Sequence, residues 1–240
     1  MRNVVVTGGS RGIGLAIARK LAASNYNVIV AARRESDEFR EAIGNLSGTL
    51  HFRAFDLSRI DAIPGFVKSL REEFGAIYGL VNNAGIGTEG LLATMHNSEI
   101  EALVRLNVLL PMILTKYVVR HMMAEGEGRI INVSSIIAST GYNGLSVYGA
   151  TKAAMTGFTR SLAREVGKLG ITVNAIAPGF IATELTQGLG GEGRQRIAAR
   201  SALRRLTEAD DVARMVEYLL GEGGRNITGS VLTIDAGNTA

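Results

Sequence analysis

The chain has 240 residues, 46% of them hydrophobic, and no cysteine. It is long enough to bury one large core, and the lack of cysteine excludes disulfides, thiolate metal ligands and a cysteine nucleophile. Because the net charge of +4 is mild, the basic residues are scattered and only 5% of residues are aromatic, we expect an anionic small molecule rather than nucleic acid as a ligand.

Metal sites and membrane-spanning segments are not expected either. The three histidines, His51, His96 and His121, are far apart and show no ligand spacing, so we expect no metal. The chain enters its first strand without an apolar leader, and its apolar stretch at 106–114 is broken by Pro111. These features predict a cytoplasmic protein that does not associate with a membrane.

Short β-branched runs alternate with longer helical patterns along the whole chain. Strands are predicted at 3–7, 27–31, 50–55, 78–83, 129–135, 172–178 and 230–237. Helices are predicted through 15–23, 38–43, 66–74, 100–107, 112–123, 146–166, 192–202 and 209–220. Near-continuously apolar strands interleaved with helices indicate a seven-stranded parallel sheet covered on both faces, in one doubly wound α/β domain over residues 1–240.

A glycine-rich turn joins the first strand to the first helix. It reads Thr-Gly-Gly-Ser-Arg-Gly-Ile-Gly over residues 7–14, with the spacing G-x-x-x-G-x-G. Gly8 would allow the tight turn, Gly12 would let the backbone approach a pyrophosphate, and Gly14 would permit close helix packing. Free N–H groups and the helix dipole attract an anion at this position, so the turn predicts dinucleotide binding.

The end of the second strand predicts which dinucleotide is bound. An Asp or Glu there would bind the ribose 2′-OH, but the chain reads Ala-Ala followed by Arg33 and Arg34. Arg11 in the glycine turn adds a third cation that could reach the same place. Charge-assisted contacts from arginine suit a 2′-phosphate, so we expect NADP(H) rather than NAD(H).

Tyr148 and Lys152 are four residues apart on the helix predicted at 146–166, so their side chains should lie on one face. A phenol titrates near ~10 when unperturbed. A tyrosine that transfers protons at neutral pH therefore needs a nearby cation that favours the phenolate. The pair predicts a proton-transferring tyrosine with a lysine that adjusts its pKa.

With the glycine turn, the Asn-Asn-Ala-Gly segment at 82–85, Asn107, Ser135 and the Tyr-x-x-x-Lys pair in this order, the whole chain resembles the Rossmann-type short-chain dehydrogenase/reductase family. The resemblance implies hydride transfer from nicotinamide C4 to a carbonyl carbon. It makes Tyr148 the proton donor. Lys152 would favour the phenolate form of Tyr148 and hydrogen-bond the nicotinamide ribose. Ser135 would hold the substrate oxygen, and Asn107 would position a water that links Lys152 to solvent.

The family's spacing selects Ser135, thirteen residues before the tyrosine, over the adjacent Ser134. The resemblance also implies cofactor contacts, with Asp56 near adenine and the residues after the sixth strand near the nicotinamide carboxamide. The full set expected to bind the cofactor is Gly8, Ser10, Arg11, Gly12, Ile13, Gly14, Arg33, Arg34, Asp56, Leu57, Asn83, Ala84, Gly85, Tyr148, Lys152, Pro178, Gly179, Ile181 and Thr183.

Substrate choice is expected to depend on a lid at 181–206, which is rich in glycine and arginine. The pattern is most similar to bacterial 3-oxoacyl-[acyl-carrier-protein] reductases of fatty-acid synthesis, which implies a 3-oxoacyl thioester, an acidic carrier protein and a homotetramer. The negative charges of Glu125 and Glu127, before the fifth predicted strand, would repel an acidic carrier protein. The sequence leaves three alternative functions: an acetoacetyl-CoA reductase, a dehydrogenase of a small alcohol, sugar or steroid, and a non-enzymatic NADP(H)-binding regulatory protein.

Overall fold

The computed structural model describes residues 1–46, 48–181 and 191–240. Within them, seven parallel strands form one sheet in the order β3-β2-β1-β4-β5-β6-β7. The strands are β1 (Asn3–Thr7), β2 (Asn27–Ala32), β3 (Leu50–Ala54), β4 (Ile77–Asn82), β5 (Gly128–Val133), β6 (Ile171–Pro178) and β7 (Val231–Ile234). The predicted doubly wound parallel sheet is confirmed, and its strand order reverses between β1 and β4.

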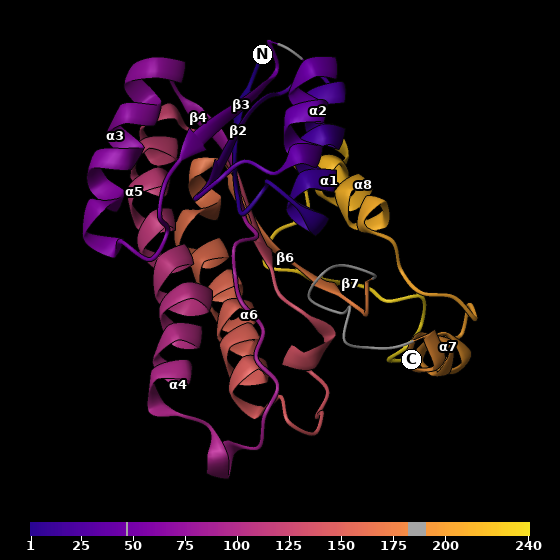
Figure 1. Ribbon diagram of the computed structural model, residues 1–240. Coiled ribbons are helices and arrows are strands. Elements are labelled where there is room, and N and C mark those ends of the chain that lie inside the picture. Colours follow the sequence, from indigo (N-terminus) through magenta and orange to yellow (C-terminus); the bar gives the residue numbers. More distant parts are fainter. Residues whose placement is uncertain (47, 182–190) are drawn as a thin grey trace.

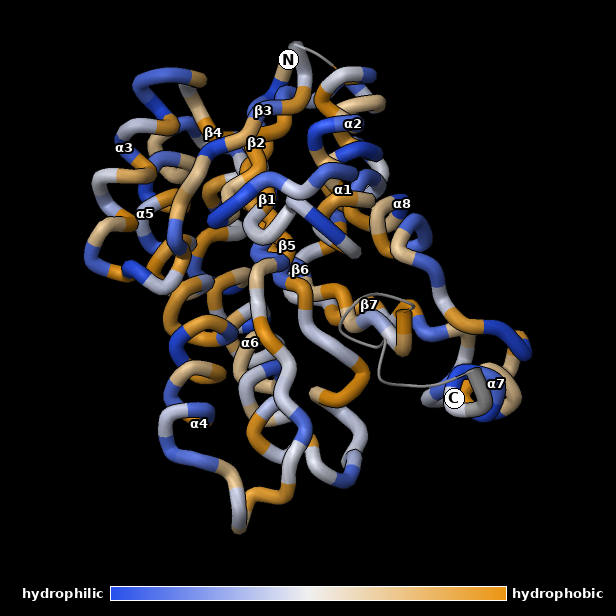
Figure 2. The backbone as a smooth tube through the Cα atoms, viewed as in Figure 1, coloured by the Kyte–Doolittle hydropathy of each residue, from blue (hydrophilic) through white to orange (hydrophobic). Residues whose placement is uncertain are grey.

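Helices cover both faces of the sheet (Figure 1). One face carries α1 (Gly12–Ala23), α2 (Asp37–Asn45) and α8 (Ala209–Leu220). The other carries α3 (Ile63–Phe74), α5 (Leu110–Glu125) and α6 (Ser146–Val166), while α4 (Asn97–Val104) and α7 (Gly191–Arg200) project beyond the sheet. Figure 2 shows the apolar strands lying between these polar-surfaced helices.

The alternation of side chains along β1 explains the two cores. Val4 and Val6 pack into the cluster beneath α1 and α8, whereas Val5 packs into the cluster beneath α3 and α5, and all three side chains are fully buried. A strand buried on both faces needs apolar residues at every position, which is why these strands read as continuous apolar runs.

The predicted break at Pro111 is wrong. Helix α4 continues into α5 through a π-helical segment, Arg105–Leu109, and Pro111 lies in the first turn of α5. A proline inside a helix removes one backbone hydrogen bond, and the π-helical segment directly before Pro111 interrupts the regular α-helical bonding at that point. The resulting helical run, Asn97–Glu125, is the one described helix long and apolar enough to cross a membrane, and 44% of its most apolar window is buried within the protein.

Four predicted strands extend too far at their carboxyl ends. The runs predicted to reach 55, 83, 135 and 237 end at Ala54, Asn82, Val133 and Ile234. Beyond β4 and β7 the backbone binds side chains, since the Asn83 and Gly237 N–H groups donate to Thr7 Oγ1 and Asp235 Oδ1. The Ser134 N–H after β5 still donates to the Ile176 carbonyl of β6. These departures all occur at the edge that carries the candidate site.

Candidate functional site

The carboxyl ends of four strands bring the predicted motifs to one edge of the sheet. The glycine turn follows β1, the Asn-Asn-Ala-Gly segment begins at the end of β4, the serine pair follows β5, and Gly179 follows β6. In open α/β sheets, ligands bind outside the carboxyl ends where the strand order reverses. The reversal between β1 and β4 therefore lies within this group of motifs.

The glycine turn is packed too closely for larger residues. Gly8 and Gly12 have φ values of +65° and +54°, in the region that favours glycine. A Cβ atom on Gly14 would lie 2.3 Å from the Gly8 carbonyl oxygen and 2.4 Å from Asn83 Nδ2. Among the described residues no side chain caps the N-terminus of α1, and its first turn holds no acidic residue. This leaves the helix N-terminus suited to an anion.

Thr7 joins the glycine turn to the end of β4, a role that the sequence pattern did not predict. Its hydroxyl, on a side chain only 2% exposed, accepts hydrogen bonds from the backbone N–H groups of Asn83 and Ala84, each at 3.0 Å. Asn83 Nδ2 donates in return to the carbonyls of Thr7 and Gly8, at 3.0 and 3.1 Å. The available signal was a polar residue closing an otherwise apolar strand beside glycines.

Arg33 and Arg34 are exposed immediately after β2, at the position predicted for the 2′-phosphate. Asp56 follows β3, and hydrogen bonds from Ser58 lower its pKa, with a smaller contribution from the positive charge of Arg33. Ser36, which was not predicted, caps α2 by accepting from the Phe39 N–H at 3.0 Å. Its hydroxyl also donates to the Ser10 carbonyl at 2.5 Å, so this contact connects α2 to the glycine turn.

Ser10 and Arg11 lie in the glycine turn itself. Two other predicted cofactor residues direct their side chains into the protein. Leu57 is 8% exposed and belongs to the core beneath α3, while Ile13 packs against the core beneath α1. Only backbone atoms of these residues are therefore expected to reach a ligand.

Lys152 is buried, with 7% of the residue exposed, and its ammonium donates to the Val133 carbonyl at 2.9 Å. Burial lowers the pKa of Lys152 to about 8. The ammonium lies 5.7 Å from the centre of the Tyr148 ring. Burial raises the pKa of Tyr148, and a hydrogen bond with Ser135 opposes that rise. Burial thus outweighs the cation that the sequence predicts as the main influence on this phenol.

Asn107 lies in the π-helical segment, and its amide binds both backbone groups of one residue. Asn107 Oδ1 accepts from the Ile86 N–H and Nδ2 donates to the Ile86 carbonyl, both at 2.9 Å. Nδ2 also donates to Thr151 Oγ1 at 3.1 Å. A Cβ atom on Gly85 would lie 2.9 Å from Asn107 Oδ1 and 3.7 Å from Lys152 Nζ, so these groups are close neighbours. π-Helical turns often occur at functional sites.

The two adjacent serines have different partners. Ser135 Oγ accepts from the Ile137 N–H at 3.2 Å, and its side chain interacts with Tyr148, opposing the rise in the pKa of that phenol. Ser134 is buried and donates through Oγ to the Lys152 main-chain carbonyl at 2.9 Å. The structure therefore brings Ser135 to the tyrosine and directs Ser134 toward the lysine backbone, a contact that sequence reasoning missed.

At the predicted nicotinamide end, Pro178 closes β6 and the Gly179 N–H donates to the Ile234 carbonyl at 2.8 Å. A Cβ atom on Gly179 would lie 2.7 Å from the Asp235 Cβ. Ile181 is buried and forms an isolated parallel bridge with Thr207. The predicted contact at Thr183 lies outside the described residues, as does the lid from 182 to 190.

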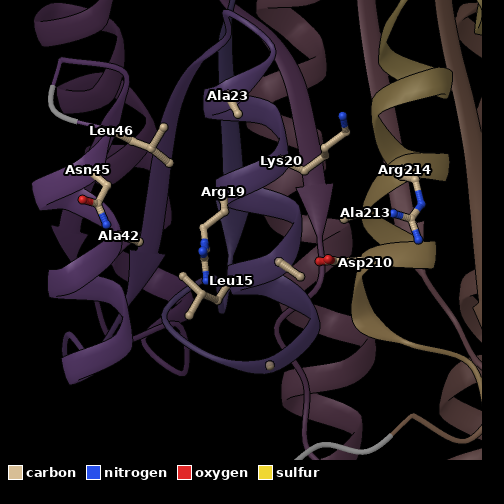
Figure 3. A pocket seen from close by; sticks show the side chains of 12 residues that line it. Leu15, Arg19, Lys20, Ala23, Ala42, Asn45, Leu46, Asp210, Ala213 and Arg214 are labelled. Atoms are coloured by element: carbon tan, nitrogen blue, oxygen red, sulfur yellow. The ribbon is translucent and has the colours of Figure 1, made fainter.

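Among the described residues, no group of three His, Asp or Glu side chains could hold a metal. A groove of about 540 Å³ runs along the outer side of α1, between α2 and α8 (Figure 3). It touches the glycine turn only at Gly12, and its lining includes none of the four predicted catalytic residues. The four predicted catalytic residues therefore lie apart from this groove.

Comparison with known proteins identifies the family. A model described as short chain dehydrogenase matches residues 2–192. The chain is 39% identical over 237 residues to the 3-oxoacyl-[acyl-carrier-protein] reductase FabG of Escherichia coli (strain K12), covering 97% of this chain and 95% of FabG. It is also 39% identical over 242 residues to the short-chain reductase protein NovJ of Streptomyces niveus, covering 97% and 92% of the two chains. A solved short chain dehydrogenase from Burkholderia cenocepacia J2315, in complex with NADP, has a TM-score of 0.92 and 35% identity, covering 100% of this chain and 98% of that one. With its motifs, fold and relatives in agreement, the chain belongs to the short-chain dehydrogenase/reductase family.

Proposed function

We propose that this protein reduces the carbonyl of a 3-oxoacyl thioester to a secondary alcohol with NADPH. Family membership gives the reaction class: the protein is an NADP-dependent oxidoreductase that acts on CH–OH and C=O groups. The observation that carries the proposal is the interaction of the Ser135 side chain with the Tyr148 phenol beside the buried ammonium of Lys152. Two hydroxyls so close together can share one carbonyl oxygen.

The residues at the carboxyl edge fit NADPH. The uncapped N-terminus of α1 suits a pyrophosphate, and the exposed Arg33 and Arg34 suit a 2′-phosphate. The Burkholderia relative with NADP bound supports the same cofactor. When bound, NADPH supplies the hydride. We assign the other tasks to side chains of this chain.

We assign to Tyr148 the donation of a proton to the developing alkoxide. Burial raises the pKa of Tyr148, so the phenol is protonated at neutral pH, as a general acid must be. Ser135 is assigned the stabilisation of charge on the substrate oxygen. Lys152, whose pKa is about 8, carries positive charge at neutral pH and stabilises the phenolate that proton donation leaves. We assign to Asn107 the positioning of a water molecule that connects Lys152 to solvent.

The assignment of a carrier-bound thioester draws on the similarity to FabG. The basic residues of α7 and the segment after it could contact an acidic carrier; they are Arg194, Arg196, Arg200, Arg204 and Arg205. Glu125 and Glu127 are exposed before β5. Glu127 pairs with Arg2 at 3.1 Å, which reduces the negative charge that a carrier would meet. The homotetramer and the cytoplasmic location stay predictions.

Initial rates with NADPH on three substrate classes test this proposal. We expect the highest kcat/KM on acetoacetyl-[acyl-carrier-protein], with lower values on acetoacetyl-CoA and on a panel of sugars and steroid ketones. Preference for the CoA ester or for a panel member would replace the carrier-bound substrate by that class. Tight NADPH binding without reduction of any carbonyl would instead indicate a regulatory protein.

A further inference from the structure

Tyr142 is a large aromatic residue left 49% exposed near the start of the helix that carries Tyr148 and Lys152. It lies on the loop between Ser135 and Tyr148, six residues before the tyrosine. Exposed apolar side chains next to a site often contact the ligand, because a ligand can cover them. The mechanism above gives Tyr142 no task.

The ring of Tyr142 packs against the ring of Phe180. Their centroids are 5.8 Å apart and their planes are tilted by 56°, within the range of favourable aromatic pairs. Phe180 lies two residues beyond Pro178, the last residue of β6. Strands β5 and β6 are neighbours, so the two rings connect the loop after β5 to the segment after β6. Both segments flank the catalytic group.

The loop that carries Tyr142 is also held from its other side. The Gly90 N–H donates to the Gly144 carbonyl at 3.0 Å, which joins the loop after β4 to the loop after β5. Leu91 and Leu92 follow directly and are 59% and 57% exposed. Exposed apolar residues therefore occur on two loops that contact each other at the carboxyl edge.

We propose that Tyr142 and Phe180 form an aromatic wall that binds an extended aliphatic group attached to the substrate carbonyl. This inference rests on the proposed carbonyl reduction and refines its substrate class. The ring of Tyr142 supplies the contact and its hydroxyl is not required. A polar sugar would cover the wall poorly, because its hydroxyl groups would lose water without gaining partners.

The test compares ethyl acetoacetate with ethyl 3-oxooctanoate, two free esters that need no carrier protein. The proteins are the wild type, Tyr142→Ala, Tyr142→Phe and the control Tyr218→Ala, which alters a similarly exposed tyrosine on α8 (52% exposed). For Tyr142→Ala we expect kcat/KM to fall about tenfold on the longer ester and to change less than about twofold on ethyl acetoacetate. Tyr142→Phe and the control should keep the wild-type ratio of the two esters.

Equal losses on both esters, or an unchanged ratio in Tyr142→Ala, would overturn the wall, and thermal unfolding identifies a loss caused by misfolding. The proposed function fails separately. If the wild-type protein reduces both esters but has a higher kcat/KM on free ketones than on the carrier-bound thioester, the assignment of a carrier-bound substrate is wrong. The ratio of kcat/KM on the two esters still tests the aromatic wall in that case. A wild-type protein that reduces neither the two esters nor acetoacetyl-[acyl-carrier-protein] overturns both proposals.

Discussion

The hydroxyl of Ser134 donates a hydrogen bond of 2.9 Å to the main-chain carbonyl of Lys152, while the Lys152 ammonium donates to the carbonyl of the preceding Val133. The turn out of β5 therefore holds the lysine at both its backbone and its side chain. Since all three residues are buried, these hydrogen bonds are shielded from water. Ser134 is a positioning residue in this arrangement, and Ser135 is the candidate that touches substrate.

Alanine substitutions separate the two serines. Ser135→Ala should lower kcat by about 10²-fold or more, because it removes the donor proposed for the substrate oxygen. Ser134→Ala should be tolerated much better, with kcat reduced less than about tenfold, because a typical hydrogen bond contributes about 1 kcal/mol. Steady-state kinetics with NADPH measures both. Equal losses would contradict the assignment of Ser135, and Ser134→Thr, which keeps the hydroxyl, is the matched control for Ser134→Ala.

Tyr148→Phe should nearly abolish turnover and leave NADPH binding largely intact. The change removes only the phenolic hydroxyl, and positioned acid catalysis contributes about 10²–10⁴-fold in rate. The measurements are single-turnover reduction and NADPH affinity by fluorescence titration. Loss of NADPH binding in this variant would instead mean that the tyrosine has a structural role.

The sheet and most helices could be predicted because apolar periodicity is a local property. Helices α6 and α8 coincide with the ranges predicted at 146–166 and 209–220. The contacts of Thr7 and Ser134 could not be predicted in this way. Thr7 binds the backbone 76 residues away and Ser134 binds a carbonyl 18 residues away, and no local pattern specifies such a partner. The effect of Pro111 could not be predicted either, because the π-helical segment before it contains Asn107, whose partner Ile86 is 21 residues away in the sequence.

Some features of the residues expected to bind the cofactor could likewise be predicted from the sequence, and others depend on the folded chain. The glycine turn could be identified because its spacing and its place before a helix are visible in the sequence. That Leu57 turns its side chain into the core could not be read from an alternating pattern, since it follows the last residue of β3 in an irregular segment. The pKa direction of Tyr148 was equally hidden, because burial is a property of the folded chain.

Replacing Arg33 and Arg34 together by alanine should reduce the preference for NADPH over NADH. Each charge-assisted hydrogen bond to a phosphate contributes about 1.5–3 kcal/mol, so kcat/KM with NADPH should fall at least about tenfold while the value with NADH changes little. Arg40→Ala is the control, since Arg40 is an exposed arginine on α2 that pairs with Glu35 and Asp37. A wild-type enzyme that used NADH as well as or better than NADPH would contradict the NADP assignment itself.

Lys152→Met should change the pH dependence of stability. Burial lowers the pKa of Lys152 from 10.5 to about 8, so between these values the unfolded chain binds more protons than the folded one. Wild-type stability therefore rises through this pH window, and the cost of the buried charge is greatest below about pH 8. Any gain of Lys152→Met over wild type should shrink by roughly 2 kcal/mol between about pH 7 and pH 9.5. Urea unfolding at both pH values measures the difference, and a stability difference that is independent of pH would show that the ammonium is not desolvated.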